Sequence, residues 1–278
     1  VMKLFFFRFV LCITLLLSLC ITCIILFSSF LFYISFLRHI GNPVCVRSWS
    51  YLVNTICYRM LGIRVEVAYS LSLDPKRPVV FLGNHPRLFE IPAYAKAVLA
   101  IIRRRNIVPI VKSELQRTPF GLAAVFLGAL PIKREKGVHA VATIHRWAKK
   151  QTGFPAIVLY PDGTRATRKK QQRVKEILLE KYNDPKKQAI ISRICSVTIP
   201  PKVAGLHALL MGLENPQCVL VRVKNNRGVT SLFDLWKNGP PTCVSVVVEG
   251  IQITSEDSQV LQDELFNLWD KKVVSFLR

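Results

Sequence analysis

The stretch Val79-Val80-Phe81-Leu82-Gly83-Asn84-His85-Pro86-Arg87-Leu88-Phe89-Glu90 is the part of the sequence from which the fold is best inferred. Its first residues form an apolar run that predicts a buried strand, and Pro86 suits the first turn of a helix that follows. A strand-to-helix junction of this kind can hold an imidazole at the edge of a sheet, with a carboxylate about one turn later to orient it. His85 and Glu90 are therefore candidates for removing a proton from an alcohol.

Strand and helix patterns alternate after this junction. The expected strands cover 63–68, 79–82, 107–111, 130–132, 156–160 and 243–253, and the expected helices cover 91–102, 121–127, 138–150, 174–182, 203–213 and 260–269. This alternation predicts an α/β fold with a mixed, largely parallel sheet flanked by helices. The polar, charge-rich segment 169–187 predicts an excursion on the surface.

The N-terminal end is far more apolar than the rest of the chain. No residue from Phe9 to Leu37 carries a formal charge, and as one helix this run would be about 43 Å long, more than a bilayer core requires. It fits one tilted membrane span or two shorter helices that enter one leaflet. A cleaved signal peptide fits less well, because the run is too long and no small-x-small cleavage site closes it.

Residues 43–61 predict a second helix with an apolar stripe. The stripe consists of residues that recur at helical spacing: Val46, Trp49, Val53, Ile56 and Met60. We expect an amphipathic helix that lies in the membrane interface, with its aromatic rings at the depth of the headgroups. A plain core helix is the alternative, because core helices carry the same kind of stripe.

The formal net charge of 39 − 17 = +22 calls for an anionic partner. Nucleic acid, a membrane surface and phosphorylated substrates all qualify, and the apolar N-terminal segment favours anionic lipid. No nucleic-acid recognition motif is found, so nucleic acid is not an expected partner. Arginines follow the apolar run, and by the positive-inside rule they place the bulk of the chain in the cytosol: Arg38, Arg47, Arg59 and Arg64.

The eight cysteines show no disulfide framework. Cys20 and Cys23 have CxxC spacing, but they lie inside the apolar run and are interpreted as small packing residues at a helix interface. The others are scattered, as in a reduced cytosolic protein. No set of residues with metal-ligand spacing is apparent, and no metal is expected.

Three further blocks follow the first. The second leads from Lys112 to Gly128-Ala129-Leu130-Pro131-Ile132-Lys133-Arg134, where glycine permits close backbone approach and an arginine at a strand end can grip a phosphate. The third, Pro161-Asp162-Gly163-Thr164-Arg165, predicts a turn whose N–H groups, hydroxyl and guanidinium suit a phosphate or an oxyanion. The fourth, Thr198-Ile199-Pro200-Pro201-Lys202, ends in a proline-rigid corner with a cation. Each block taken alone is also explained by an ordinary turn or a solvated strand end.

In this order and spacing the four blocks resemble the motifs of the glycerolipid acyltransferases, which include 1-acylglycerol-3-phosphate and lysocardiolipin-type acyltransferases. The resemblance covers residues 62–213, over half of the chain. Two positions depart from the family pattern: Glu90 stands where aspartate is usual, and Asp162 stands where glutamate is usual. Displacements on the order of 1 Å near a catalytic group can cost about a hundredfold in rate. The departures therefore predict either a site spaced differently around Glu90 or reduced activity.

The resemblance implies transfer of a fatty acyl chain from acyl-CoA to the free hydroxyl of a lysophospholipid, with 1-acyl-sn-glycerol-3-phosphate as the expected acceptor and phosphatidic acid as the product. It implies no bound cofactor, with acyl-CoA as co-substrate, His85 as general base and Glu90 as the carboxylate that orients it. It also implies a set of substrate-binding residues: Asn84, Lys112, Gly128, Arg134, Asp162, Gly163, Thr164, Arg165, Pro201 and Lys202. The alternatives are a lysocardiolipin-type acceptor and a catalytically weak relative that binds anionic lipid.

The expected organisation is a membrane anchor over 1–61, comprising the apolar helix 9–37 and the interfacial helix 43–61, and an acyltransferase domain over 62–278. The protein is expected to be integral to a membrane, with the catalytic domain facing the cytosol. The endoplasmic reticulum is the expected compartment, and the bacterial inner membrane is the alternative.

Overall fold

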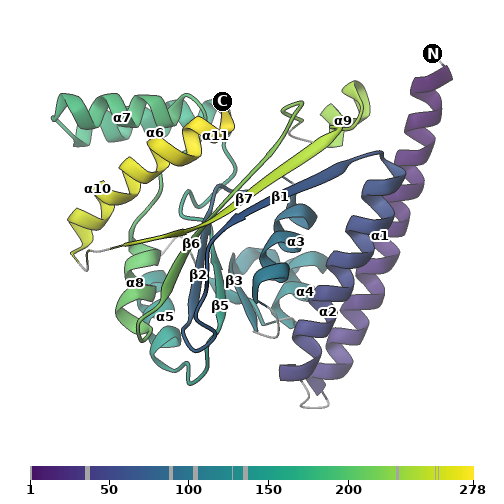
Figure 1. The fold of residues 1–278 in the computed structure, drawn as a ribbon, viewed down its shortest axis with the longest axis horizontal. Helices are drawn as coiled ribbons and strands as arrows, with labels where there is room; N and C mark the ends of the chain where they lie inside the picture. Colours follow the sequence, from purple (N-terminus) through teal and green to yellow (C-terminus); the bar gives the residue numbers. More distant parts are fainter. Residues whose placement is uncertain are drawn as a thin grey trace.

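A mixed β-sheet forms the centre of the fold (Figure 1). The computed structural model describes residues 2–34, 38–87, 90–102, 106–126, 128–133, 137–229, 232–253, 255 and 257–278. Within this part of the chain the sheet has seven strands in the order β1-β7-β6-β2-β5-β3-β4. The strands are β1 (Arg64–Ser70), β2 (Val79–Gly83), β3 (Ile107–Lys112), β4 (Leu130–Ile132), β5 (Ala156–Leu159), β6 (Gln217–Asn225) and β7 (Cys243–Ile251). Only β6 and β7 pair antiparallel among these strands, which confirms the predicted mixed, largely parallel sheet.

The middle of the sheet is buried on both faces, as parallel strands covered by helices require. Along β2, Val79 and Phe81 pack into one apolar core, while Val80 and Leu82 pack into the other. All four side chains are fully buried. This burial on both faces explains why β2 appears in the sequence as a continuous apolar run.

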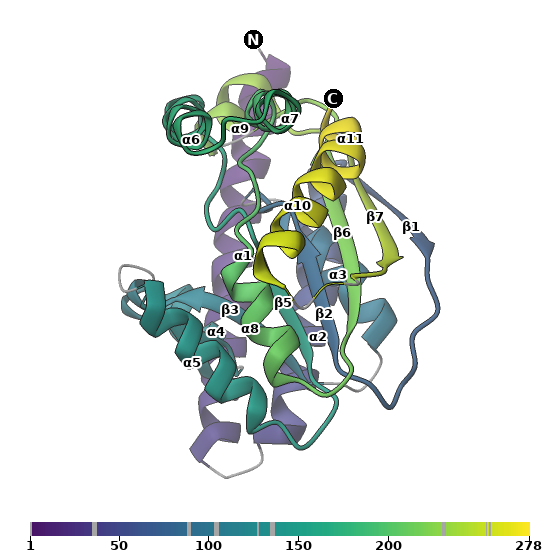
Figure 2. The same ribbon diagram turned by 90° about the vertical axis from the view of Figure 1, so that its left-hand side faces the viewer.

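Helices cover each face of the sheet. One core contains residues of α5 (Gly137–Lys149), α8 (Ala204–Gly212) and α10 (Ser258–Leu268), and the other contains residues of α3 (Ile91–Ile102). Figure 2 shows α5, α8 and α10 in front of the sheet and α1 behind it. The remaining helical segments are α4 (Pro119–Phe126), α6 (Arg168–Lys181), α7 (Pro185–Cys195), α9 (Leu232–Asn238), α11 (Ser275–Leu277), the 3₁₀ turn η2 (Ser113–Arg117) and the π-helical turn η3 (Trp269–Val274).

The N-terminal part consists of two long helices that lie side by side (Figure 1). They are α1 (Met2–Ile34) and α2 (Arg38–Leu52), and α2 continues into the π-helical segment η1 (Val53–Tyr58). The stretch Phe7–Ile25 of α1 is long and apolar enough to cross a membrane. Several of its apolar side chains are exposed, among them Leu16 (62%) and Ile24 (64%), as contact with lipid would require.

One face of α2 and η1 packs against the α/β domain. Tyr58 is buried in the same core as residues of α3, with Val46 packed against it, and the side-chain amide of Asn54 donates a 2.9 Å hydrogen bond to the carbonyl of Pro92 at the start of α3. Tyr51, by contrast, is 68% exposed. The structure thus shows which face of this helix packs on protein, and its placement in a membrane interface stays a prediction.

One local expectation from the sequence was wrong, one strand was not expected, and one surface segment is more helical than expected. Pro86 does not lie in the first turn of a helix, because residues 84–87 have no regular secondary structure and α3 begins at Ile91. The central strand β6 was not expected, because charged residues interrupt its apolar run. The segment 169–187 does lie on the surface, where α6 has no buried residue, but it is largely helical and leads into α7.

Candidate functional site

The predicted site residues gather at one edge of the sheet. Because β2 pairs in parallel with both β5 and β6, the carboxyl ends of these three strands lie together. Asn84 and His85 follow β2, Asp162 follows β5, and Asn225 ends β6. In parallel α/β sheets this edge is where ligands usually bind.

Asn84 joins the loop after β2 to strand β6. Its side-chain amide donates to the carbonyl of Val223 at 2.9 Å, and its side-chain carbonyl accepts from the N–H of the same residue at 3.0 Å. Asn84 is buried. Its two side-chain hydrogen bonds hold the residue that follows β2 against the backbone of β6. They place the next residue, His85, beyond the last strand pair. Substrate binding by Asn84 stays a prediction.

His85 is held at three points. Its backbone N–H donates to Oδ2 of Asp162 at 2.9 Å, and its ring stacks on that of Tyr160 with the centroids 4.9 Å apart. Its Nδ1 lies 3.1 Å from the carbonyl oxygen of Pro86. This last contact is a hydrogen bond when Nδ1 carries the proton, and that tautomer places the basic lone pair on Nε2.

Tyr160 forms a half-buried support for the imidazole. Its ring makes an edge contact with that of Tyr94, with the centroids 5.5 Å apart. Burial raises the pKa of the Tyr160 hydroxyl, and the neighbouring Asp162 carboxylate raises it further. The phenol therefore stays neutral at physiological pH, and its ring acts as a platform for His85.

Glu90 is buried, with only 2% of its surface exposed. Its Oε2 accepts the backbone N–H of Arg87 at 2.8 Å, and its Oε1 accepts the side-chain amide of Asn225 at 2.7 Å. Burial raises the pKa of the carboxyl, and these two hydrogen bonds partly oppose that rise. The contacts tie Glu90 to the loop that carries His85 and to the end of β6. A direct hydrogen bond between Glu90 and His85 stays a prediction.

The third and fourth motifs meet beside His85. Gly163 has a φ of 71°, which favours glycine, and its N–H closes a tight turn on the carbonyl of Tyr160 at 2.9 Å. The backbone N–H of Lys202 donates to the carbonyl of Pro161 at 2.8 Å. Pro201 is buried, whereas Lys202 is exposed. Two segments that are distant in the sequence therefore form one corner of the site.

A hydroxyl and two cations border this corner. The Thr164 hydroxyl accepts a 2.8 Å hydrogen bond from the ammonium group of Lys170, at the start of α6. Arg165 is exposed. The hydroxyl, the ammonium and the guanidinium suit an anionic group that approaches from solvent.

The second motif lies two strands away from β2 along the same edge. Lys112 is exposed at the carboxyl end of β3, and β3 is separated from β2 by β5. Gly128 is buried with a φ of 91°, so its conformation serves the turn into β4. Arg134 lies outside the described residues, so its predicted role is not addressed by the structure.

The sequence interpretation missed three residues that the structure brings to the site: Asn225, Tyr160 and Lys170. Tyr160 directly precedes the third motif, so its position next to the site was open to inference. Asn225 follows the segment 218–224, in which Arg222 and Lys224 interrupt an apolar run, and it precedes Asn226-Arg227-Gly228, a polar sequence that signals a loop. Lys170 stands in the basic run that begins α6, where a specific contact is not distinguishable from general positive charge.

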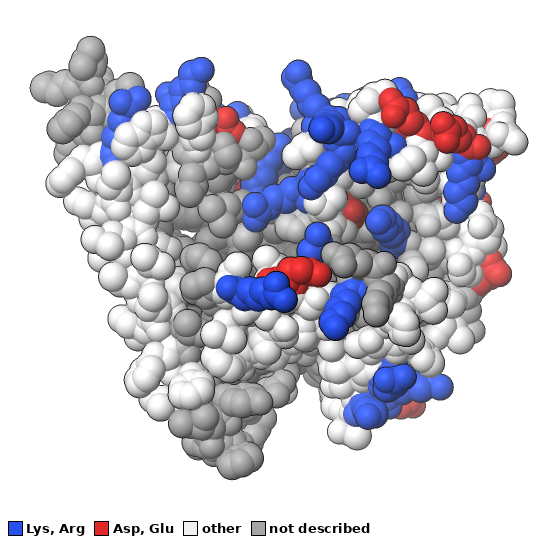
Figure 3. Space-filling view, turned by 180° about the vertical axis from the view of Figure 1, so that it is seen from behind, with Lys and Arg blue, Asp and Glu red and all other residues white. Residues whose placement is uncertain are grey.

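The surface also favours anionic ligands. Figure 3 shows Lys and Arg side chains gathered over the upper half of the face opposite to that of Figure 1, with few acidic side chains among them. The chain carries a net charge of +22. A surface of this kind raises the local concentration of anionic lipids and phosphorylated molecules.

Comparison with a protein-family model agrees with this arrangement. The family model described as Acyltransferase matches residues 64–194, which include His85, Glu90 and the third motif. Among solved structures, the 1-acyl-sn-glycerophosphate (LPA) acyltransferase PlsC from Thermotoga maritima is similar with a TM-score of 0.43 and 12% sequence identity, over 92% of this chain and 97% of that chain. No curated protein matches the sequence.

Proposed function

We propose that the chain is a glycerolipid acyltransferase, which transfers a fatty acyl chain from acyl-CoA to the free hydroxyl of a lysophospholipid, and the match of residues 64–194 to the Acyltransferase family model supports this proposal. The proposed acceptor is 1-acyl-sn-glycerol-3-phosphate and the product phosphatidic acid. The observation that carries the proposal is the placement of His85 at the carboxyl edge of the sheet, held by Asp162 and Tyr160, inside the matched region.

In the proposed reaction, Nε2 of His85 removes the proton from the acceptor hydroxyl as its oxygen attacks the thioester carbonyl. The new carbon–oxygen bond forms as the carbon–sulfur bond breaks, and the proton passes from the imidazolium to the departing thiolate of CoA. Buried Glu90 supplies the negative charge that stabilises the imidazolium. The substrate oxygen is itself the nucleophile, so no acyl-enzyme is required.

The corner formed by the third and fourth motifs is proposed to bind the acceptor phosphate. The Thr164 hydroxyl and the Lys170 ammonium group are already in contact there, and exposed Arg165 and Lys202 supply further positive charge. We propose that α1 embeds the protein in the membrane and that the catalytic domain faces the cytosol at the endoplasmic reticulum. The exposed apolar side chains of α1 support this placement.

Replacing His85 tests the proposal. With the full chain in neutral lipid nanodiscs, His85→Ala is expected to abolish product formation from oleoyl-CoA and 1-oleoyl-lysophosphatidate, measured by thiol release and lipid analysis. The matched control His139→Ala removes an exposed histidine on α5 and should leave turnover unchanged. Wild-type turnover in His85→Ala would show that the general base is a different group.

A further inference from the structure

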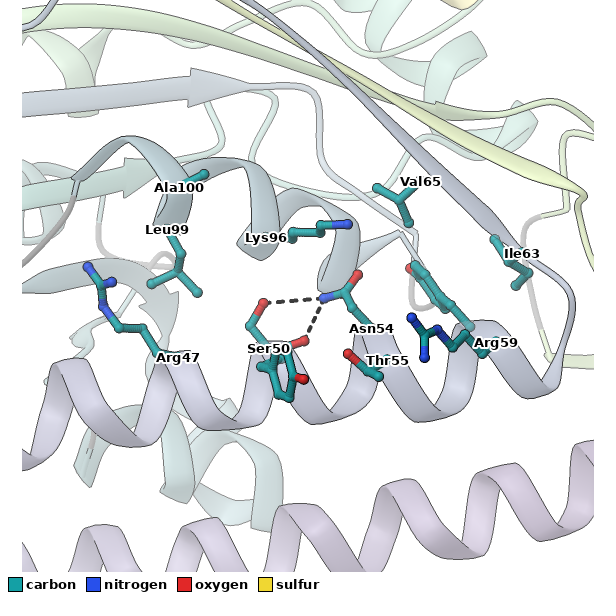
Figure 4. A pocket seen from close by; sticks show the side chains of 12 residues that line it. Arg47, Ser50, Asn54, Thr55, Arg59, Ile63, Val65, Lys96, Leu99 and Ala100 are labelled. Carbon is teal, nitrogen blue, oxygen red and sulfur yellow. Dashed lines mark hydrogen bonds between the residues drawn. The ribbon is translucent and has the colours of Figure 1, made fainter.

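A pocket with basic and hydroxyl groups in its lining lies on the other side of α3, away from the site described above (Figure 4). It has a volume of about 440 Å³ and is bounded by α2, η1, α3 and the start of β1. Three basic residues line it: Arg47, Lys96 and Arg59. Among the described residues that line it, none is acidic and none belongs to the predicted catalytic or substrate-binding set.

The lining combines polar and apolar side chains. The hydroxyls of Ser50, Tyr51 and Thr55 come from α2 and η1, Arg47 lies on α2, and Arg59 directly follows η1. The apolar residues Leu99 and Val65 come from α3 and β1. Basic and hydroxyl groups next to apolar side chains suit a ligand with an anionic head and an apolar body.

Two polar atoms of the lining residues are buried without a hydrogen-bond partner in the described part of the chain, the acceptor Oδ1 of Asn54 and the donor Nη2 of Arg47. A guanidinium has only donors, so a buried nitrogen of this group is satisfied only by an oxygen that enters from outside. Phosphate oxygens are the acceptors for which arginine geometry is best suited.

The three cations do not converge on one point. Arg47 and Arg59 lie twelve positions apart in the sequence, which corresponds to about 18 Å along a helix, and Figure 4 shows them toward opposite ends of the groove with Lys96 between them. As drawn, the two guanidinium groups lie at different parts of the groove. The groove therefore offers more than one phosphate position, as neighbouring headgroups at a membrane surface would use.

The surroundings of the groove indicate where such a ligand comes from. The helix α2 packs along α1, whose exposed face is apolar. Tyr51, beside the pocket, is 68% exposed, and amphipathic aromatic rings of this kind are enriched at the headgroup level of membranes. We propose that this pocket binds the phosphate headgroups of anionic membrane phospholipids, at a site separate from the catalytic residues, and that this binding seats the domain on the leaflet.

Lipid titration of the full chain tests the proposal. The delipidated protein, in a neutral detergent, is titrated with dioleoylphosphatidylglycerol, and bound lipids are counted by native mass spectrometry. The triple variant R47Q/R59Q/K96Q is expected to bind this lipid at least about tenfold more weakly, because charge-assisted hydrogen bonds are lost. The control R146Q/K149Q/K150Q removes the same charge from exposed positions on and just after α5 and should change affinity less than about twofold.

Two comparisons distinguish lipid binding in the pocket from attraction by surface charge and from binding of a soluble phosphate compound. Equal weakening in both triple variants would overturn the proposal, because it would show that general positive charge binds the lipid. Titration with inorganic phosphate is expected to give no binding that depends on the three residues, and binding with the same dependence would show that the ligand is a soluble phosphate compound.

Misfolding of the triple variant would also weaken lipid binding, so a single variant is tested separately. Lys96 is exposed, so Lys96→Gln should fold normally while losing about threefold or more in affinity for phosphatidylglycerol. Unchanged affinity in Lys96→Gln would also overturn the proposal. His85→Ala should bind phosphatidylglycerol like the wild type, which separates the pocket from the catalytic site.

Discussion

The side-chain amide of Asn225 donates a 2.7 Å hydrogen bond to Oε1 of Glu90, and both residues are buried. The same carboxylate accepts the backbone N–H of Arg87 through its other oxygen. Glutamate is one methylene longer than the aspartate usual in the family motif. Here the longer side chain contacts both the loop after β2 and Asn225 at the end of β6. The departure in the first motif is therefore matched by a partner elsewhere in the fold.

Shortening this carboxylate should reduce activity. In Glu90→Asp the carboxylate falls short of Asn225, so we expect kcat/KM for acyl transfer to fall by about tenfold or more, since a charge-assisted hydrogen bond contributes about 1.5–3 kcal/mol. Steady-state kinetics with oleoyl-CoA and 1-oleoyl-lysophosphatidate provide the measurement. A rise in rate would mean instead that glutamate is a handicap at this position.

Removing Asn225 should change the pH dependence as well as the rate. The hydrogen bond from Asn225 lowers the pKa of Glu90, against the larger upward effect of burial. Its loss in Asn225→Ala therefore raises the pKa, and Glu90 takes up its proton at a higher pH. We expect the acid limb of the kcat/KM profile to move to higher pH. Asn226→Ala, which removes an exposed asparagine bonded to Thr242, should leave the limb in place.

The ring of Tyr160, rather than its hydroxyl, should support His85. Tyr160→Phe keeps the stacking contact and is expected to retain activity within about twofold, whereas Tyr160→Leu should lose about two- to tenfold, because aromatic pairs contribute about 0.5–1.5 kcal/mol beyond their burial. Kinetics of both variants at one pH decide between ring and hydroxyl. Equal losses in both would assign the effect to the hydroxyl.

Asp162 should contribute to stability through the backbone of His85. In Asp162→Ala the His85 N–H loses the acceptor that it has at 2.9 Å, and an unpaired buried donor costs about 1–3 kcal/mol. We expect a lower thermal midpoint and lower turnover. Asp162→Asn retains a carbonyl oxygen at this position and should recover most of the stability, so comparable losses in the two variants would point to the carboxylate charge.

Gly83 should tolerate no side chain. A Cβ on Gly83 would lie 2.4 Å from the carbonyl oxygen of Val221 on the adjoining strand β6. Gly83→Ala must therefore push β2 and β6 apart, and we expect a loss of about 1–3 kcal/mol in stability. Gly153→Ala is the control, because a Cβ there meets nothing within 4 Å. Denaturant unfolding of the two variants provides the comparison.

Much of the fold was predictable because burial leaves a periodic pattern in the sequence. The run Val79–Leu82 indicated a strand buried on both faces, and the bounds expected for α3 match those observed. Strand β6 escaped prediction because Arg222 and Lys224 interrupt its apolar run. In the folded protein Arg222 pairs with Glu249 at 2.8 Å, and both cations lie over the ring of Phe276. Those partners come from β7 and the C-terminal helix, so the local sequence does not reveal that the two charges are accommodated in a central strand.

The sequence determined the order of the motifs, the strand before His85 and the chemical groups available for proton transfer. The tertiary structure decided which of those groups meet. Asn225 lies 135 positions from Glu90, and it reaches the carboxylate only because β6 pairs with β2 in the middle of the sheet. Strand order is set by the packing of many side chains that are distant in the sequence. A sequence motif contains information only about residues that are close together along the chain.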